Sequence, residues 1–180
     1  TALIYKSMKT TYIFVVLLII SSCSGGSSNI IEEEDSGIPG DELNSINETC
    51  TNTSRNGVDK CDLTHDDRNR FYYLYVTDNL DTNQSIPVLF AFHGYGSSAL
   101  RHLGYTNYMP IADKNNFIVV YPQGETTSTL SAHWNVGGWT SKSTVQDLEF
   151  VETVIDLLKD KLPIDESRIY SSGMSNGGYM

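Results

Sequence analysis

The sequence has little positive charge, few cysteines and no N-terminal apolar run long enough to cross a bilayer. Its 12 lysine and arginine residues are outnumbered by 22 aspartate and glutamate residues, which leaves a formal net charge of −10 over 180 residues. Because the basic residues form no stripe, we expect no nucleic-acid partner. The apolar run at residues 12–20 has nine residues, whereas a membrane-spanning helix needs roughly 20. Its length is typical of the apolar part of a secretory signal peptide.

The residues around this run predict export. Met8-Lys9 supplies a start and a positive charge before it, and Ile20-Ser21-Ser22-Cys23 follows it. The second pattern resembles the lipobox of bacterial lipoproteins, in which the cysteine sulfur is acylated and becomes the mature N-terminus. We therefore expect residues 1–22 to comprise upstream residues and a signal peptide, and Cys23 to carry a lipid that anchors the protein to a membrane. The protein would then be an outer-membrane or cell-surface lipoprotein, otherwise an extracellular protein; a plain signal peptide or short anchor is the alternative.

A polar stretch follows, from residue 23 to residue 62. It is rich in serine and glycine at its start, acidic at residues 32–35, and has no hydrophobic period. This composition predicts a flexible tether, so we expect the folded domain at residues 63–180. Cys50 and Cys61, the remaining two of three cysteines, predict a disulfide in an oxidising compartment. Two free thiols are the alternative.

The remaining sequence alternates predicted strands and helices. The apolar runs 87–92 and 117–121 are continuous, which indicates strands buried on both faces of a parallel sheet. We expect residues 168–172 to form a third buried strand. The aromatic run 71–76 predicts a further strand, which could belong to an antiparallel hairpin at the sheet edge.

Two predicted helices separate these strands. Residues 99–115 predict one that Pro110 should interrupt, and residues 144–161 predict a second, with Leu148, Val151, Ile155 and Leu158 on its apolar face. Strands and helices in this order predict an α/β fold, with a mostly parallel sheet covered by helices on both faces.

The last predicted strand runs into Gly173-Met174-Ser175-Asn176-Gly177, which matches the G-x-S-x-G pattern. In this pattern the serine stands on a sharp turn between a strand and a helix, and the glycines prevent clashes with neighbouring backbone. We therefore expect Ser175 to be a catalytic nucleophile.

The glycine-rich stretch 93–96 follows the strand 87–92 and predicts the oxyanion hole. Acyl transfer places negative charge on a carbonyl oxygen, which fixed N–H donors must meet. One donor should be the amide of Asn176 and the other the amide of Tyr95, with Gly94 as the alternative. We expect His93 to order this loop rather than to take part in catalysis.

The general base is not expected among these residues. All four histidines, at positions 65, 93, 102 and 133, precede Ser175, whereas α/β-hydrolases have the order Ser, Asp or Glu, His. We expect the acid and the histidine beyond Met180, so that the chain is the N-terminal part of its domain, truncated just after the nucleophile.

Several separated motifs together resemble one family. They are Val88-Leu89-Phe90-Ala91-Phe92-His93-Gly94, Ala112-Asp113 with Phe117-Ile118-Val119-Val120-Tyr121-Pro122, His133-Trp134-Asn135, Asp147-Leu148 with Phe150, Ile164-Asp165 with Arg168-Ile169-Tyr170, and Gly173-Met174-Ser175-Asn176-Gly177-Gly178. The combination resembles the secreted polyhydroxybutyrate depolymerase and feruloyl or acetylxylan esterase family of α/β-hydrolases. The resemblance implies hydrolysis of an ester in a polymer or plant polysaccharide, without cofactor or metal. It also implies that Trp134 and Asn135 border the substrate cleft; a tryptophan that closes the core is the alternative for Trp134.

Two other functions stay open from the sequence. A serine peptidase of the same fold would use the same nucleophile and oxyanion donors. A surface-anchored lipoprotein could keep the fold and bind a polymer without catalysis; the intact G-x-S-x-G pattern disfavours it.

Overall fold

The computed structural model describes residues 3–6, 47–55 and 57–180, and the signal peptide, Cys23 and most of the expected tether lie outside them. In chain order the elements are β1 (Leu3–Lys6), β2 (Glu48–Asn52), β3 (Val58–His65), β4 (Arg68–Tyr75), β5 (Ile86–Phe92), α1 (Ala99–Thr106), α2 (Met109–Asn115), β6 (Ile118–Pro122), the 3-10 turn η1 (Gly138–Thr140), α3 (Asp147–Lys161), β7 (Ile164–Gly173) and α4 (Asn176–Tyr179). No helix in this described part is both long and apolar enough to cross a membrane.

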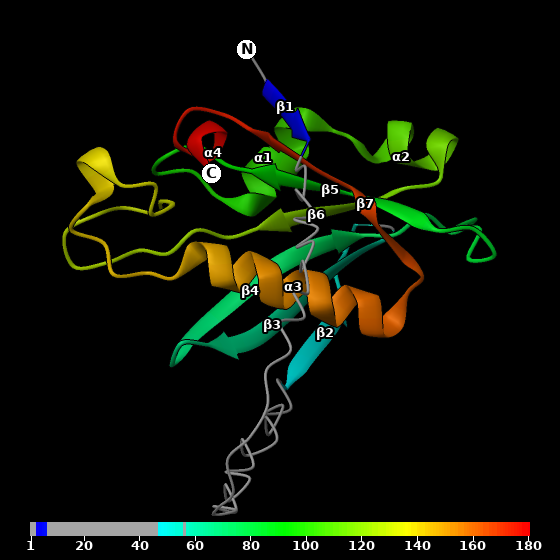
Figure 1. Ribbon diagram of the computed structural model, residues 1–180, viewed down its shortest axis with the longest axis horizontal. Coiled ribbons are helices and arrows are strands. Elements are labelled where there is room, and N and C mark those ends of the chain that lie inside the picture. The colour runs from blue at the N-terminus through cyan, green and yellow to red at the C-terminus, as the bar shows by residue number, and fades with distance from the viewer. Residues whose placement is uncertain (1–2, 7–46, 56) are drawn as a thin grey trace, which may run out of the picture. The chain divides into compact units, whose positions relative to one another are not determined.

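Seven strands form one mixed sheet in the order β1-β7-β5-β6-β4-β3-β2 (Figure 1). Strands β6, β5 and β7 are parallel, and these are the three strands that the sequence predicts to be buried. The other neighbours pair antiparallel, so the parallel part is smaller than expected. Strands β2, β3 and β4 are joined by turns of a few residues, which permit only antiparallel pairing.

The sheet begins earlier in the chain than the expected boundary at residue 63. Residues 48–62, predicted to be tether, form β2 and most of β3, so that part of the prediction is wrong. The β3–β4 turn contains Asp66 and Asp67 with φ angles of 50° and 55°. Two-residue turns with positive φ usually contain glycine or asparagine, so this pair of aspartates is only a weak hairpin signal. Strand β4 pairs with both β3 and β6 and therefore lies inside the sheet rather than at its edge.

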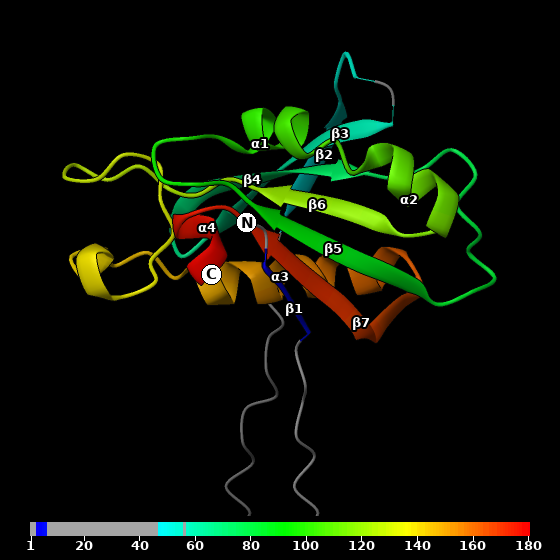
Figure 2. The same ribbon diagram turned by 90° about the horizontal axis from the view of Figure 1, so that it is seen from above.

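Helices cover both faces of the sheet, as expected. Figure 2 shows α1 and α2 on one face and α3 on the other. Neighbouring residues of β6 alternate between the two: Ile118 and Val120 pack in the core beneath α3, and Val119 packs in the core beneath α1 and α2. This two-sided burial explains why the strand is apolar at every position.

The buried face of α3 differs from the predicted one. Its buried residues are Asp147, Phe150, Val154 and Leu158, whereas Leu148 is 63% exposed. The predicted stripe was therefore displaced around the helix. Phe150 is the largest side chain of the helix and sets which face packs on the sheet.

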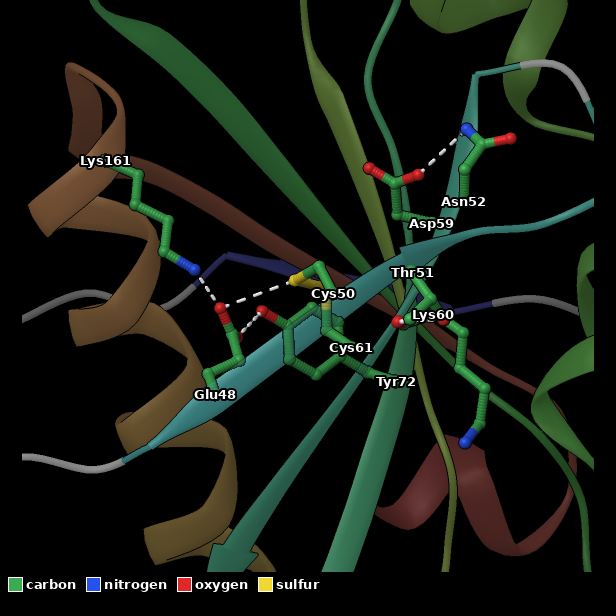
Figure 3. Close-up of a disulfide and its surroundings, with 9 residues drawn as sticks. All are labelled: Glu48, Cys50, Thr51, Asn52, Asp59, Lys60, Cys61, Tyr72 and Lys161. Carbon is green, nitrogen blue, oxygen red and sulfur yellow. Dashed lines mark hydrogen bonds and ion pairs between the residues drawn. A yellow bond between two sulfur atoms is a disulfide. The ribbon is translucent and has the colours of Figure 1, made fainter.

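Cys50 and Cys61 pair across β2 and β3 and form a disulfide (Figure 3). Next to it, the Glu48 carboxylate accepts a hydrogen bond from the Tyr72 hydroxyl and pairs with the ammonium group of Lys161, at the end of α3. The first hairpin is thus covalently closed and also tied to a helix.

Candidate active site

Ser175 lies between β7 and α4 in a strained backbone conformation. Its φ and ψ angles are 52° and −120°, a combination that side chains with a Cβ rarely adopt. Its side chain has no hydrogen-bond partner in the described part of the chain. Strain of this kind is expected where a nucleophile is presented on a sharp turn.

The two glycines of the pattern are required by space. A methyl group on Gly177 would lie 2.5 Å from the carbonyl oxygen of His93 and closer still to that of Phe92. A methyl group on Gly173 would overlap the carbonyl group of Gly177. Each close approach is to backbone, which cannot turn aside as a flexible side chain can. The tight turn therefore depends on glycine at both positions.

The predicted oxyanion loop, residues 93–96, lies beside this turn because β5 and β7 are neighbouring parallel strands. The Met174 amide donates to the Phe92 carbonyl over 3.2 Å, and a methyl group on Gly94 would lie 3.5 Å from Cβ of Ser175. The amides of Tyr95 and Asn176 have no acceptor among the described residues.

His93 orders the loop. Its Nδ1 lies 2.8 Å from the Gly94 carbonyl oxygen, and its Nε2 accepts a hydrogen bond from the Gly124 amide over 2.9 Å. Since Nε2 accepts, Nδ1 carries the proton and donates. Burial lowers the pKa of His93, so the ring stays neutral. These bonds occupy both nitrogens and leave none for Ser175.

The other three histidines either bond to other residues or are buried. His133 bonds to the Ser131 carbonyl and the Ser143 hydroxyl, and His65 lies 3.3 Å from the Thr153 hydroxyl. His102 is buried, and this burial lowers its pKa to about 4. No histidine in the described segments bonds to Ser175.

Comparisons with known proteins agree with this geometry. Residues 104–180 match the prolyl oligopeptidase family. The solved structure of an S-formylglutathione hydrolase from Agrobacterium tumefaciens aligns with a TM-score of 0.53 and 15% identity, over 72% of this chain and 53% of the other. The chain has the α/β-hydrolase fold.

Among curated proteins, the chain is similar to esterases. It is 36% identical over 110 residues to a feruloyl esterase B of Thermothelomyces thermophilus, covering 60% of this chain and 36% of the relative. It is 32% identical over 109 residues to a bifunctional acetylxylan esterase/xylanase of Neocallimastix patriciarum, covering 61% and 15%. The chain thus spans about a third or less of the length of these relatives.

Trp134 does not border a cleft, contrary to what the family resemblance implies. Its side chain is 0% exposed and packs edge-on against Phe92, with ring centroids 5.1 Å apart. The Asn135 side chain is also engaged within the protein, since it donates hydrogen bonds to the carbonyls of Ser143 and Val145. The alternative is therefore correct for Trp134, which closes the core beneath the site.

Two exposed aromatic residues, Tyr95 in the predicted oxyanion loop and Trp139 in η1, are 44% and 55% exposed. Their rings meet edge to face with centroids 5.0 Å apart. Gly137 and Gly138 precede Trp139 with φ angles of 73° and 54°, which turn the chain sharply outward. The Gly-Gly-Trp pattern was the available signal, but it was overlooked beside Trp134.

An ion pair beneath the site was also missed. Arg70 donates from Nη2 to Asp147 over 2.7 Å and to the Gln123 carbonyl over 3.2 Å, and its guanidinium lies 3.9 Å from the centre of the Phe150 ring. Both charged side chains are buried. From its sequence position alone, Asp147 is an acidic residue near the start of a predicted helix, where it would favour the helix dipole. Arg70 stands two positions before the inward-facing Tyr72, and this spacing could have indicated a buried arginine.

Proposed function

We propose that the protein is a serine esterase that hydrolyses carboxylic esters of a polymer or plant polysaccharide through an acyl-enzyme on Ser175. The observation that carries this proposal is the strained Ser175, set between two sterically required glycines and beside the free amides of Tyr95 and Asn176. This arrangement suits nucleophilic attack on a carbonyl group and stabilisation of the oxyanion that forms.

In this mechanism the Ser175 hydroxyl attacks the ester carbonyl while a histidine removes its proton. The two amides bind the oxyanion; the histidine then protonates the leaving alcohol, and an acyl-enzyme remains. Water, activated by the same histidine, releases the carboxylic acid. Because the acid and histidine follow the nucleophile in α/β-hydrolases, we place both in sequence that follows Met180. No cofactor takes part.

The substrate class rests on the relatives and on the exposed aromatic pair. The relatives are named as feruloyl and acetylxylan esterases, and Tyr95 supplies both an oxyanion amide and part of the exposed surface. The flat rings of Tyr95 and Trp139 could pack against the sugar or aromatic part of such an ester. A polyhydroxyalkanoate is the other polymer that the sequence resemblance allows.

A serine peptidase is the second candidate, because the matched prolyl oligopeptidase family covers the nucleophile region. Ester and amide hydrolysis use the same nucleophile and oxyanion donors. The two are separated by comparing methyl ferulate and p-nitrophenyl acetate with chromogenic peptide anilides. Faster turnover of the anilides would favour the peptidase.

We also propose export and lipid anchoring at Cys23, from the signal-like residues that precede it. The whole gene, expressed in a bacterial host with a fatty-acid probe, should give a labelled protein in the membrane fraction. Cys23→Ala should lose the label, and equal labelling of that variant would contradict the anchor.

The decisive test of the esterase compares three proteins: the product of the whole gene, its Ser175→Ala variant, and residues 1–180 alone. The first should hydrolyse methyl ferulate or p-nitrophenyl acetate. The other two should be inactive, because one lacks the nucleophile and the other lacks the base that activates it. Substantial turnover by Ser175→Ala would show that the nucleophile is wrong.

A further inference from the structure

The two oxyanion donors come from different parts of the fold and must still converge on one oxygen atom. Asn176 is the first residue of α4, whereas Tyr95 belongs to the loop after β5. Effective donors lie about 2.7–3.1 Å from the oxyanion, so the separation of these two backbone segments has to be fixed. A residue that bonds to both segments could fix this separation.

Trp134 bonds to both. Its indole Nε1 donates to the His93 carbonyl over 2.8 Å, two residues before the Tyr95 amide. Its backbone amide donates to Oδ1 of Asn176 over 2.7 Å, and its carbonyl accepts from Nδ2 of the same side chain over 3.1 Å. The paired bonds fix the Asn176 side chain in one orientation. All three bonds are buried.

The segment that carries Trp134 is itself held in place. The next amide, that of Asn135, donates to Oδ2 of Asp147 over 2.7 Å, and Oδ1 of the same carboxylate accepts from Arg70. The indole packs between Phe92 and His93, with both ring centroids at 5.1 Å. Trp134 is therefore anchored to α3 and β4 as well as to the two donor segments.

We infer that Trp134 is a positioning residue that sets the distance between the Tyr95 and Asn176 amides. The inference rests on the proposed esterase function and adds to it a residue that touches no substrate. Since the oxyanion exists only in the transition state, displaced donors lower kcat with little effect on KM. A residue needed only for folding would lower the amount of active enzyme and leave each active site unchanged.

The test uses Trp134→Phe in the product of the whole gene, because phenylalanine keeps an aromatic ring and removes the indole N–H. Active sites are counted with a fluorophosphonate that labels Ser175. We expect kcat per labelled site to fall about 10- to 100-fold, as for a small misplacement of catalytic groups, with KM within about threefold. The inhibition constant of a boronic acid, whose adduct places an oxygen in the oxyanion hole, should rise by a similar factor, whereas that of the carboxylate product should not.

A control variant should separate this effect from general destabilisation. Tyr75→Phe removes the hydroxyl that donates to Asp113 over 2.6 Å, at the start of the parallel strands and thus at the opposite end from Ser175. It should lower stability while kcat per labelled site stays within twofold.

A second variant, Asn176→Ala, keeps the backbone donor and the indole but removes both bonds to the Trp134 backbone. It should also lower kcat, and the double variant should lose less than the product of the two single losses because each variant breaks one link of the same bridge between the two donor segments. If either single variant keeps kcat and boronic-acid affinity within about threefold of the parent per labelled site, the positioning role is wrong. Failure of the esterase proposal is seen separately, as activity in Ser175→Ala.

Discussion

The sharpest prediction concerns Gly177, whose replacement by alanine adds one methyl group against backbone. That methyl group would lie 2.5 Å from the His93 carbonyl oxygen, whereas ordinary contacts of this kind start at 3.4 Å. The difference, 3.4 − 2.5 = 0.9 Å, is the least shift that α4 or the loop after β5 must make, because the Phe92 carbonyl oxygen lies closer still. Since Phe92 ends the central strand β5, α4 is the part expected to move.

The shift acts directly on the proposed chemistry. Asn176, which offers one oxyanion amide, precedes Gly177 and would move with it. A misplacement of about 1 Å can lower a catalytic rate about 100-fold, and overpacking of this kind typically costs about 1–3 kcal/mol of stability. We therefore expect Gly177→Ala to lose about 100-fold or more in kcat/KM and to unfold at lower urea concentration.

Gly178 provides a matched control in the same helix. A methyl group there meets nothing closer than 3.4 Å, so Gly178→Ala should keep activity and change stability by no more than about 1 kcal/mol. The assay is methyl ferulate hydrolysis by the product of the whole gene, normalised to fluorophosphonate-labelled sites. If Gly177→Ala kept kcat/KM within threefold of the parent, or if the two variants lost activity equally, the steric reasoning would be refuted.

Two further predictions address the disulfide and the exposed aromatic pair. The cysteines are 11 positions apart, for which the loop-entropy relation gives a stabilisation of about 3 kcal/mol. A phosphine reductant should therefore lower the free energy of unfolding of the parent, measured in urea, by about 2–3 kcal/mol, and should leave the Cys50→Ala/Cys61→Ala variant unaffected. An equal response of both proteins would contradict the pairing. Trp139→Ala should raise KM for feruloylated oligosaccharides about fivefold without lowering the melting temperature, because the side chain is largely exposed. Leu148→Ala, at a comparably exposed apolar residue, should change neither the KM nor the melting temperature. An unchanged KM in Trp139→Ala would show that the aromatic pair does not contact the substrate.

The parallel part of the fold could be predicted from sequence because its signals are local. Strands β5 and β6 are apolar runs, β7 leads directly into the G-x-S-x-G pattern, and the first predicted helix is interrupted just before Pro110, which lies in the first turn of α2. Strand β2 could not be found in this way because almost all of it is exposed, which leaves no apolar alternation to detect. Its place in the sheet depends on pairing with β3 and on the bond between cysteines.

The same distinction applies to the site. Ser175 and its glycines lie within five consecutive residues, so spacing alone predicted the turn. Trp134 and Trp139 are both tryptophans of one loop, and only the fold decides that one is buried and the other exposed. Which side chain can reach substrate depends on contacts between segments that are far apart in sequence.

Asp147 offers a test in which the sequence-based and structural interpretations give different numbers. As a helix-start residue, it would contribute about 0.3–1 kcal/mol through the helix dipole, and Asp147→Asn would resemble Glu149→Gln in the same first turn of α3. As the buried partner of Arg70, Asp147 balances the charge of the guanidinium group. The other carboxylate paired with this group, that of Glu125, is farther away, at 3.7 Å. Removing one partner of a buried ion pair costs about 3–5 kcal/mol.

We therefore expect Asp147→Asn to lower the free energy of unfolding by about 3 kcal/mol or more, and exposed Glu149→Gln to change it by less than about 0.5 kcal/mol. Asp147→Asn should also lower kcat per labelled site, because the carboxylate that holds the Asn135 amide beside Trp134 is changed. Urea unfolding and active-site titration measure the two effects separately. Equal small losses of stability in both variants would show that Asp147 acts only as a helix-start residue. They would also contradict the view that its ion pair with Arg70 supports the site.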